Sequence, residues 1–234
     1  MTTTTWFMAI IMTDTGDLYR LLSWLSPSYP IGAFSYSHGL EYSVENGSVR
    51  TAHDVLDWVS TVLLQGTGRV DGVLFREAYS AVVVANWGHL DEIVDLGNSF
   101  QATSEFALET RAQGNAFIKA TLAAWPSAAL TRIEKGAVYP VAVAVACAAH
   151  EISLETALHG YFHAFAANLV SAAVRLVPLG QTDGQLAIAA LADAVSQVEN
   201  QSLTTPLDDI GSAAPLIDLA SMHHETQYTR LFRS

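Results

Sequence analysis

The sequence predicts an all-α protein, folded as a single compact domain of about eight to ten helices with an extended C-terminal arm. Apolar residues recur at three- and four-residue spacing through most of the chain, which is typical of helices with one buried face. The sustained alternation of apolar and polar residues that half-buried strands need is missing. Residues that cap helices stand at several of the expected helix starts.

The expected helices follow one another along the chain. Thr51 is placed to cap a helix that runs to Leu64, with Asp54 in its first turn. Thr182 stands three residues before Gln185, as a capping box requires, so a helix over 183–200 is expected. Further helices are expected over 18–25, 35–45, 70–87, 90–98 and 105–124.

Two apolar segments in the second half of the chain are predicted to be buried. The segment 154–176 carries one helical stripe, made of Leu154, Leu158, Tyr161, Phe162, Phe165, Leu169, Ala172, Ala173 and Leu176. In the segment 140–150, valine alternates with alanine, and valine favours strands. The alanines and the helical neighbourhood favour a buried helix there.

Proline and glycine mark the connections and divide the chain into three parts. Loops are expected over 26–32, 125–126 and 178–181, and an extended arm over 202–215. We therefore expect an N-terminal extension over 1–16, a helical domain over 17–201, and a C-terminal arm with a partner-binding tail over 202–234.

The charge balance excludes several classes of function. With 11 Lys and Arg against 23 Asp and Glu, the formal net charge is -12, so the chain should repel nucleic acid and anionic lipid surfaces. Charged residues make up 15% of the chain, against roughly 25% in an ordinary soluble domain. Either part of an apolar surface is covered by other proteins, or the core is large and rich in alanine.

The chain is expected to be soluble and cytoplasmic. Its one cysteine, Cys147, lies in an apolar run and is interpreted as a buried structural thiol, which fits a reducing compartment. The apolar stretch 6–12 lacks the basic flank and cleavage site of a signal peptide. Two charge-free stretches, 21–40 and 156–174, reach the roughly 18 residues of a membrane span, but the first contains two prolines and several serines and the second two histidines and an asparagine, so neither is the apolar stretch that a span needs.

Two groups of histidines could bind a metal ion. Glu155, His159 and His163 stand at four-residue steps on one face of the expected helix, but a third or fourth ligand is not evident. His223 and His224 are adjacent and point in different directions on a helix, so a docking role is favoured for them. We expect no metal site and no enzyme activity, because P-loop and Gly-x-Ser-x-Gly motifs are absent and no acid–base pair is singled out.

Three segments, in order and spread over nearly the whole chain, resemble the UreF family of urease accessory proteins. They are 25–41 (LSPSYPIGAFSYSHGLE), 168–185 (NLVSAAVRLVPLGQTDGQ) and 222–234 (MHHETQYTRLFRS), with a weaker match at 109–114 (ETRAQG). His38 stands where many relatives have glutamine. The resemblance implies an all-helical homodimer that joins a UreD/UreH-type accessory protein and a UreG-type GTPase on apo-urease.

The resemblance also implies what this assembly does. It delivers nickel into urease and modulates the GTPase, with no cofactor held stably by this chain. The alternative is a metallochaperone that binds nickel itself, through Glu155, His159 and His163 or through His223 and His224.

The resemblance assigns partner contact to two sets of residues. The first is in the C-terminal segment and consists of His224, Glu225, Gln227, Tyr228, Arg230, Phe232 and Arg233. Aromatic residues flanked by arginine often anchor interfaces, although this segment could instead fold back on the protein's own core. The second set, which could equally give structural support, consists of Pro30, Gly32, Phe34, Ser37 and Glu41.

Overall fold

A computed structural model describes residues 15–234, and it confirms the all-α fold, with no strand in that range. The α-helices are α1 (Thr15–Trp24), α2 (Leu40–Glu45), α3 (Ala52–Leu64), α4 (Thr67–Val83), α5 (Trp87–Ser99), α6 (Ser104–Ala124), α7 (Ala128–Arg132), α8 (Tyr139–Ala149), α9 (Leu154–Leu176), α10 (Gln181–Ala190), α11 (Ala192–Thr204) and α12 (Pro215–His224), and the 3-10 helices are η1 (Ala33–Ser35) and η2 (Leu207–Asp209). The expected N-terminal extension lies outside the described residues except for Thr15 and Gly16, which belong to α1.

The core is built around α8, the predicted buried helix. Every side chain from Val141 to Cys147 is fully buried, and α8 packs against α4, α6, α7 and α9. Pro140 stands in the first turn, where its missing N–H costs no hydrogen bond. A side chain at Gly114 of α6 would place its Cβ 2.0 Å from the carbonyl oxygen of Ala137, so glycine permits the close approach of the two segments.

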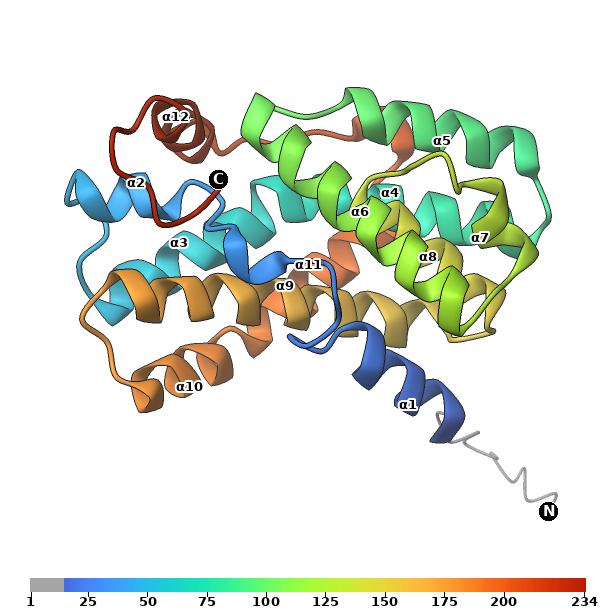
Figure 1. Ribbon diagram of the computed structural model, residues 1–234, viewed down its shortest axis with the longest axis horizontal. Helices are drawn as coiled ribbons and strands as arrows, with labels where there is room; N and C mark the ends of the chain where they lie inside the picture. Colours follow the sequence, from blue (N-terminus) through green and yellow to red (C-terminus); the bar gives the residue numbers. More distant parts are fainter. Residues whose placement is uncertain (1–14) are drawn as a thin grey trace, which may run out of the picture.

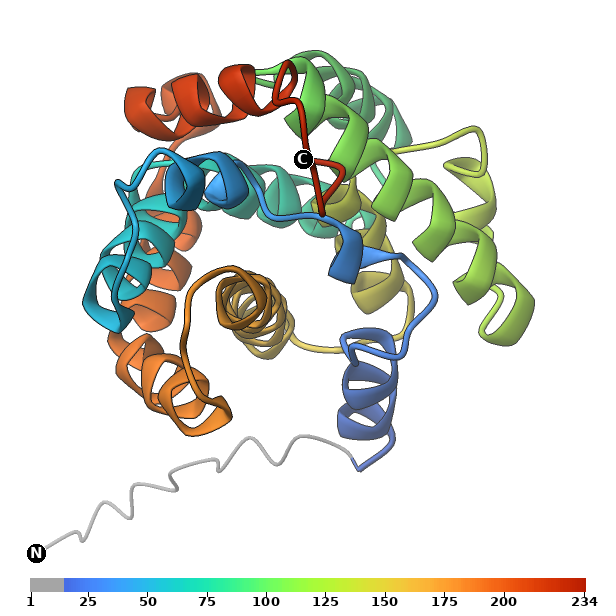
Figure 2. The same cartoon turned by 60° about the vertical axis from the view of Figure 1, so that its left-hand side comes forward.

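Helix α9 has the bounds that the apolar stripe predicts. Its N-terminus is capped by Ser153, whose hydroxyl accepts a hydrogen bond from the Thr156 amide. Leu158, Phe162 and Leu169 on the stripe are fully buried. Figure 2 looks nearly along α9 and shows the other helices arranged around it. Within residues 15–234, no helix combines the length and the apolar character needed to cross a membrane.

Two helices have bounds that differ from the expected ones, because residues beside them take left-handed backbone conformations. The expected helix over 35–45 begins only at Leu40, because His38 (φ 59°) and Gly39 (φ 79°) both turn the chain out of the helical region. The expected helix over 70–87 ends at Val83, and Ala85 (φ 54°) separates α4 from α5. The side chain of Asn86 then caps α5 by accepting from the His89 amide.

The region 178–204 differs from the prediction in the residue that caps its first helix and in forming two helices instead of one. The predicted capping box at Thr182 is wrong: α10 begins at Gln181, and the side chain of Asp183 accepts from the Gly180 amide at 2.9 Å. The expected single helix over 183–200 is divided into α10 and α11 at Leu191, whose buried side chain packs into the core. The short α7 was not expected, and Ser127 caps it.

The C-terminal part returns to the body of the protein. After α11 the chain passes through η2, and the amide of Ala213 donates to the carbonyl of Gln65 before α12 begins. Residues 225–234, which we name the C-terminal tail, then fold back, and the chain ends beside α2 (Figure 1). The expected arm over 202–215 thus connects two helices, and the segment after it lies on the protein's own surface.

Candidate partner-binding surface

The two sets of residues singled out in the sequence lie together. The backbone of Ser37 donates to the carbonyl of Ser234 at 2.8 Å, and the backbone of Arg233 donates to the carbonyl of Ser35 at 2.8 Å. The Ser37 hydroxyl also donates to the carbonyl of Ser234. Residues 30–41 and 224–234 therefore form one structural unit, which we name the clasp.

Two side chains of helix α9 contact the clasp. The guanidinium of Arg175 donates to the carbonyl of Phe34 at 2.8 Å and lies 4.4 Å from the centre of the Phe232 ring. The amide of Asn168 donates to the carbonyl of Ala33 at 3.1 Å. Both residues belong to the second segment that resembles the UreF family, and through them this segment contacts residues 33 and 34 and the tail.

The interior of the clasp is a buried network of carboxylates and an imidazole. His224 is fully buried and contacts Glu41 through Nε2 at 3.0 Å and Glu105 through Nδ1 at 2.8 Å. The backbone amides of Leu231 and Phe232 donate to the Glu41 carboxylate at 2.6 and 2.9 Å. Such contacts are needed because a buried ionised group without partners is strongly unfavourable.

Glu105 contacts both the buried His224 and the exposed Arg230. Its carboxylate contacts the guanidinium of Arg230 at 3.1 Å. Burial raises the pKa of Glu105, and the contacts with His224 and Arg230 oppose that rise without cancelling it. Arg230 is exposed, so the same side chain that neutralises a buried carboxylate also faces the solvent.

The outer face of the clasp is basic and aromatic. Phe34 is 66% exposed, Leu231 is 67% exposed and Tyr228 is fully exposed. Arg233 is exposed as well and lies over the Tyr36 ring at 5.6 Å. Three of the 11 cationic side chains, Arg175, Arg230 and Arg233, gather here in a chain with a net charge of -12. A hollow of about 560 Å³ lies beside them and is lined by α6 and the tail.

The structure divides the proposed contact residues into supporting and displayed positions. His224, Phe232, Ser37 and Glu41 are buried, so in this conformation they hold the clasp together instead of facing a partner. For His224 and Phe232 the alternative, folding back on the protein's own core, describes their position, and for Ser37 and Glu41 structural support does. Gly32 has φ 73° and forms the turn of the loop.

The remaining residues are accessible, and their contact with a partner stays a prediction. Pro30, Phe34, Glu225, Tyr228, Arg230 and Arg233 are exposed, and Gln227 is half-buried. Glu225 accepts a hydrogen bond from the Ser104 hydroxyl at 2.8 Å, and Gln227 bonds to Glu45.

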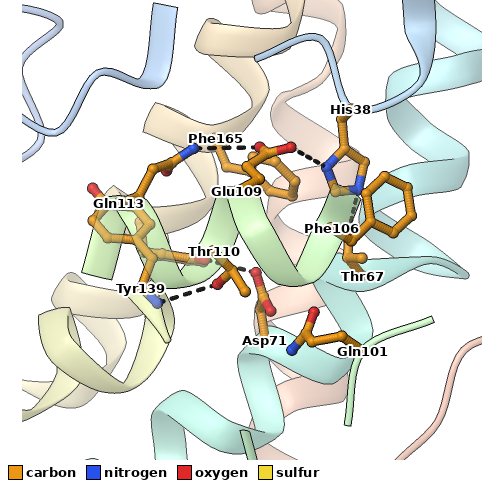
Figure 3. A pocket seen from close by; sticks show the side chains of 11 residues that line it. His38, Thr67, Asp71, Gln101, Phe106, Glu109, Thr110, Gln113, Tyr139 and Phe165 are labelled. Carbon is orange, nitrogen blue, oxygen red and sulfur yellow. Dashed lines mark hydrogen bonds and ion pairs between the residues drawn. The ribbon is translucent and has the colours of Figure 1, made fainter. Parts of the chain in front are cut away.

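A small internal cavity of about 30 Å³ lies under the clasp (Figure 3). His38, stacked on Phe106, contacts Glu109 through Nδ1 at 3.3 Å and the Thr67 hydroxyl through Nε2 at 2.8 Å. Glu109 also accepts from the hydroxyl of Ser234 at 2.7 Å, which connects the tail to this cluster.

Asp71 lies on another wall of the cavity (Figure 3). It accepts a hydrogen bond from the Tyr161 hydroxyl at 2.7 Å. Burial raises the pKa of Asp71 to about 7, although the Tyr161 bond opposes the rise. With this pKa, the carboxyl group titrates near neutral pH.

The metal candidates lie in two different places. Glu155, His159 and His163 line a groove of about 690 Å³ between α1 and α9, where His159 contacts Glu199 at 2.9 Å. His223 stacks on Tyr42, with the ring centres 4.9 Å apart. Among the described residues, no three His, Cys, Asp or Glu side chains come together in a way that could hold a metal ion.

Three carboxylates of this region were missed by sequence reasoning. Glu105 and Asp71 are single acidic residues within helices, and nothing local distinguishes them from solvent-exposed ones. Glu109 begins the weaker match 109–114, which was the one available signal. Their contacts come from residues far away in the chain, and spacing in the sequence does not report such contacts.

Comparison with known proteins gives one family. A family model described as UreF matches residues 49–192. A Granulibacter bethesdensis protein named urease accessory protein UreF is 52% identical over 227 residues, which cover 94% of this chain and 96% of that protein. A protein of the same name from Rhodopseudomonas palustris strain BisA53 is 47% identical over 221 residues, covering 93% of each.

Proposed function

The chain belongs to the UreF family, and from this premise we propose that it is a urease accessory protein that assembles with a UreD/UreH-type accessory protein and a UreG-type GTPase on apo-urease. In this assembly nickel is the cargo that enters the urease active site. The chain contributes binding surfaces and modulates the partner GTPase, and it performs no substrate chemistry itself. It acts in the cytoplasm as a homodimer.

The observation that carries the proposal is the clasp. Two segments separated by about two hundred residues in the sequence meet and present exposed aromatic and basic side chains on one face. Arginine and tyrosine supply much of the binding energy in protein interfaces, and buried contacts hold them in place here. Basic groups on an acidic protein also give a partner a surface of defined charge.

The low fraction of charged residues supports binding to several proteins at once. Large apolar side chains are exposed on α1 and α12, among them Leu22 (66%) and Leu216 (77%). Exposed apolar patches on soluble proteins mark contact sites more often than chance. These surfaces lie outside the clasp, so they are available to a second copy of the chain or to a further accessory protein.

The test is co-purification of the full-length protein with the other urease accessory proteins. We expect the pair of substitutions Tyr228→Ala and Arg230→Ala to reduce recovery of the complex at least about tenfold, because both residues are of the types that act as hot spots. Arg132→Ala is the matched control, since Arg132 is also exposed, pairs with Asp91 at 2.6 Å and lies over the Trp87 ring. Equal recovery of the tail variant and the control would refute the proposal.

The effect on the GTPase is measured separately. An arginine supplied by a partner can accelerate GTP hydrolysis by about 10³ to 10⁵. Hydrolysis by the UreG-type partner is compared with the wild-type protein, Arg230→Ala and Arg233→Ala at protein concentrations that keep the complex formed. A rate that is unchanged in both variants would remove direct action of these arginines while leaving the binding role intact.

A further inference from the structure

Glu41 occupies an unusual position in the clasp, because its carboxylate accepts hydrogen bonds from three groups of the C-terminal part. These are the amides of Leu231 (2.6 Å) and Phe232 (2.9 Å) and the Nε2 atom of His224 (3.0 Å). Glu41 itself is 7% exposed and lies in α2, about 190 residues earlier in the sequence. A carboxylate can accept up to about four hydrogen bonds, so these three contacts use most of its capacity.

His224 extends this arrangement to a second helix. Its other ring nitrogen contacts Glu105 of α6, so one imidazole connects α2, α6 and α12. Both contacts are hydrogen bonds only when both nitrogens carry a proton, since carboxylates are acceptors. Arg230 completes the arrangement by contacting the other oxygen of Glu105.

The last two residues are held by Ser35 and Ser37, which lie a few residues before Glu41 in the sequence. Beyond Leu231 and Phe232, the chain continues to the backbone contacts between Arg233 and Ser35 and between Ser37 and Ser234. The Ser37 hydroxyl accepts from the Glu41 amide at 3.2 Å and donates to the carbonyl of Ser234. Glu41 therefore holds the residue just before the tail and two residues near its end, while Ser35 and Ser37 hold the last two residues.

We propose that Glu41 is the positioning residue of the C-terminal tail: by holding His224 and the amides of Leu231 and Phe232, it keeps Tyr228, Arg230 and Arg233 in the orientation in which they face a partner. The inference rests on the proposed function only where it concerns a partner. The attachment of the tail to Glu41 is a property of the isolated protein and can be measured without one.

Glu41→Gln should detach the tail and leave the helical body folded. Glutamine has nearly the same shape but replaces one acceptor oxygen with an NH₂ group, which cannot accept from an amide or from a protonated imidazole. The body is held by the apolar residues of the core around α8, and Glu41 is not one of them. Loss of a hydrogen bond to a charged group should raise the open fraction of the tail by roughly tenfold or more.

Limited trypsin digestion of the full-length protein, followed by intact-mass measurement, tests this. Cleavage after Arg230 requires the segment containing Leu231 and Phe232 to leave its position, whereas Lys135 is an exposed site in the body. We expect cleavage after Arg230 to be about tenfold faster or more in Glu41→Gln, with the rate at Lys135 unchanged. Glu45→Gln is the matched control, because Glu45 is on the same helix, is exposed and touches the tail only through Gln227.

Each result decides the question. Unchanged cleavage after Arg230 would overturn the proposal, and so would equal acceleration at Arg230 and Lys135, because Glu41 would then support the whole fold. If Glu41→Gln does not yield folded protein, Glu41→Asp is used, which keeps the charge but withdraws it by one methylene group, and we expect selective acceleration by a smaller factor. Tail release without loss of co-purification would support the positioning role and contradict the proposed function of the tail.

Discussion

The core around α8 and the interior of the clasp are both buried, but different forces hold them. In α8, seven consecutive side chains from Val141 to Cys147 are fully buried, and all are apolar or a thiol. In the clasp, Glu41 and His224 are buried against Glu105 of α6, and each of the three depends on partners at hydrogen-bond distance. Apolar burial is non-directional and tolerates many arrangements, whereas the polar network requires particular atoms at particular places.

The difference teaches where the protein should be sensitive to substitution. A change in α8 acts on the stability of the whole domain, because α8 contacts most of the long helices. A change in the clasp should act on the tail, whose attachment is separate from the core.

A carboxylate placed in α8 should prevent stable folding. Ala144→Asp would bury an acid with no partner, at a cost of several kcal/mol, which is a large part of the stability of a typical domain. We expect loss of the cooperative urea transition in circular dichroism. Ala144→Ser is the control, because its hydroxyl can bond to the carbonyl one helical turn earlier, and it should cost about 1–2 kcal/mol. A cooperative transition of near wild-type midpoint in Ala144→Asp would contradict the account of α8.

Asp71 is an exception to the apolar character of the core, because it is a buried titratable group like those of the clasp. Its pKa is raised from 3.8 to about 7 by burial. Between these values the folded protein binds a proton that the unfolded chain releases, so this group's contribution to stability is greatest below pH 4 and is lost as the pH rises to about 7. The loss should be on the order of 4 kcal/mol.

Asp71→Asn should remove that pH dependence. The side-chain oxygen of asparagine can still accept from the Tyr161 hydroxyl, but the group cannot ionise. We expect the free energy of unfolding, measured by urea titration at several pH values, to fall less steeply between pH 4 and 7 in the variant than in the wild type. Parallel curves for the two proteins would show that Asp71 does not titrate in this range.

Phe232→Ala measures the apolar part of the clasp. The ring is 4% exposed and lies against Arg175. Removing a buried phenylalanine from a core costs about 3–5 kcal/mol, but the tail can detach without opening the core, so we expect a loss of about 2 kcal/mol in urea unfolding. Phe232→Leu should lose less than half of that. A loss as large as that of a core phenylalanine such as Phe162 would mean that the tail belongs to the core.

The sequence predicted the regions that are organised locally. The stripe over 154–176 predicted α9 to the residue, and the alanines and the helical neighbourhood of the segment 140–150 predicted the buried helix α8. Helix ends were predicted less well where the backbone takes a left-handed conformation at non-glycine residues. His38 and Ala85 do so, and the residue type alone does not predict a left-handed conformation at either position.

The clasp could be predicted only in part. The residues of 25–41 and 222–234 were singled out through a resemblance, but their contact with each other was not, because it joins positions about two hundred residues apart. Four of them, Ser37, Glu41, His224 and Phe232, were expected to face a partner or to support one surface, and their burial follows from the partners that the fold supplies. Glu105 was missed for the same reason.

Thr51 shows that sequence separation, and not polarity, decides whether a contact can be predicted from the sequence. Its contacts are polar, like those of the clasp, but they join residues close together in the sequence, as in α8. The hydroxyl of Thr51 accepts from the Asp54 amide at 3.2 Å, and the Asp54 carboxylate accepts from the Thr51 amide at 2.9 Å. This capping box was read from the sequence because donor and acceptor are three residues apart. Thr51→Ala should lower the free energy of unfolding by about 1 kcal/mol, and Thr51→Ser by less than half of that. If Thr51→Ala also accelerated cleavage after Arg230 more than cleavage at Lys135, the tail would depend on α3, and the separation between the local and the long-range polar contacts would fail.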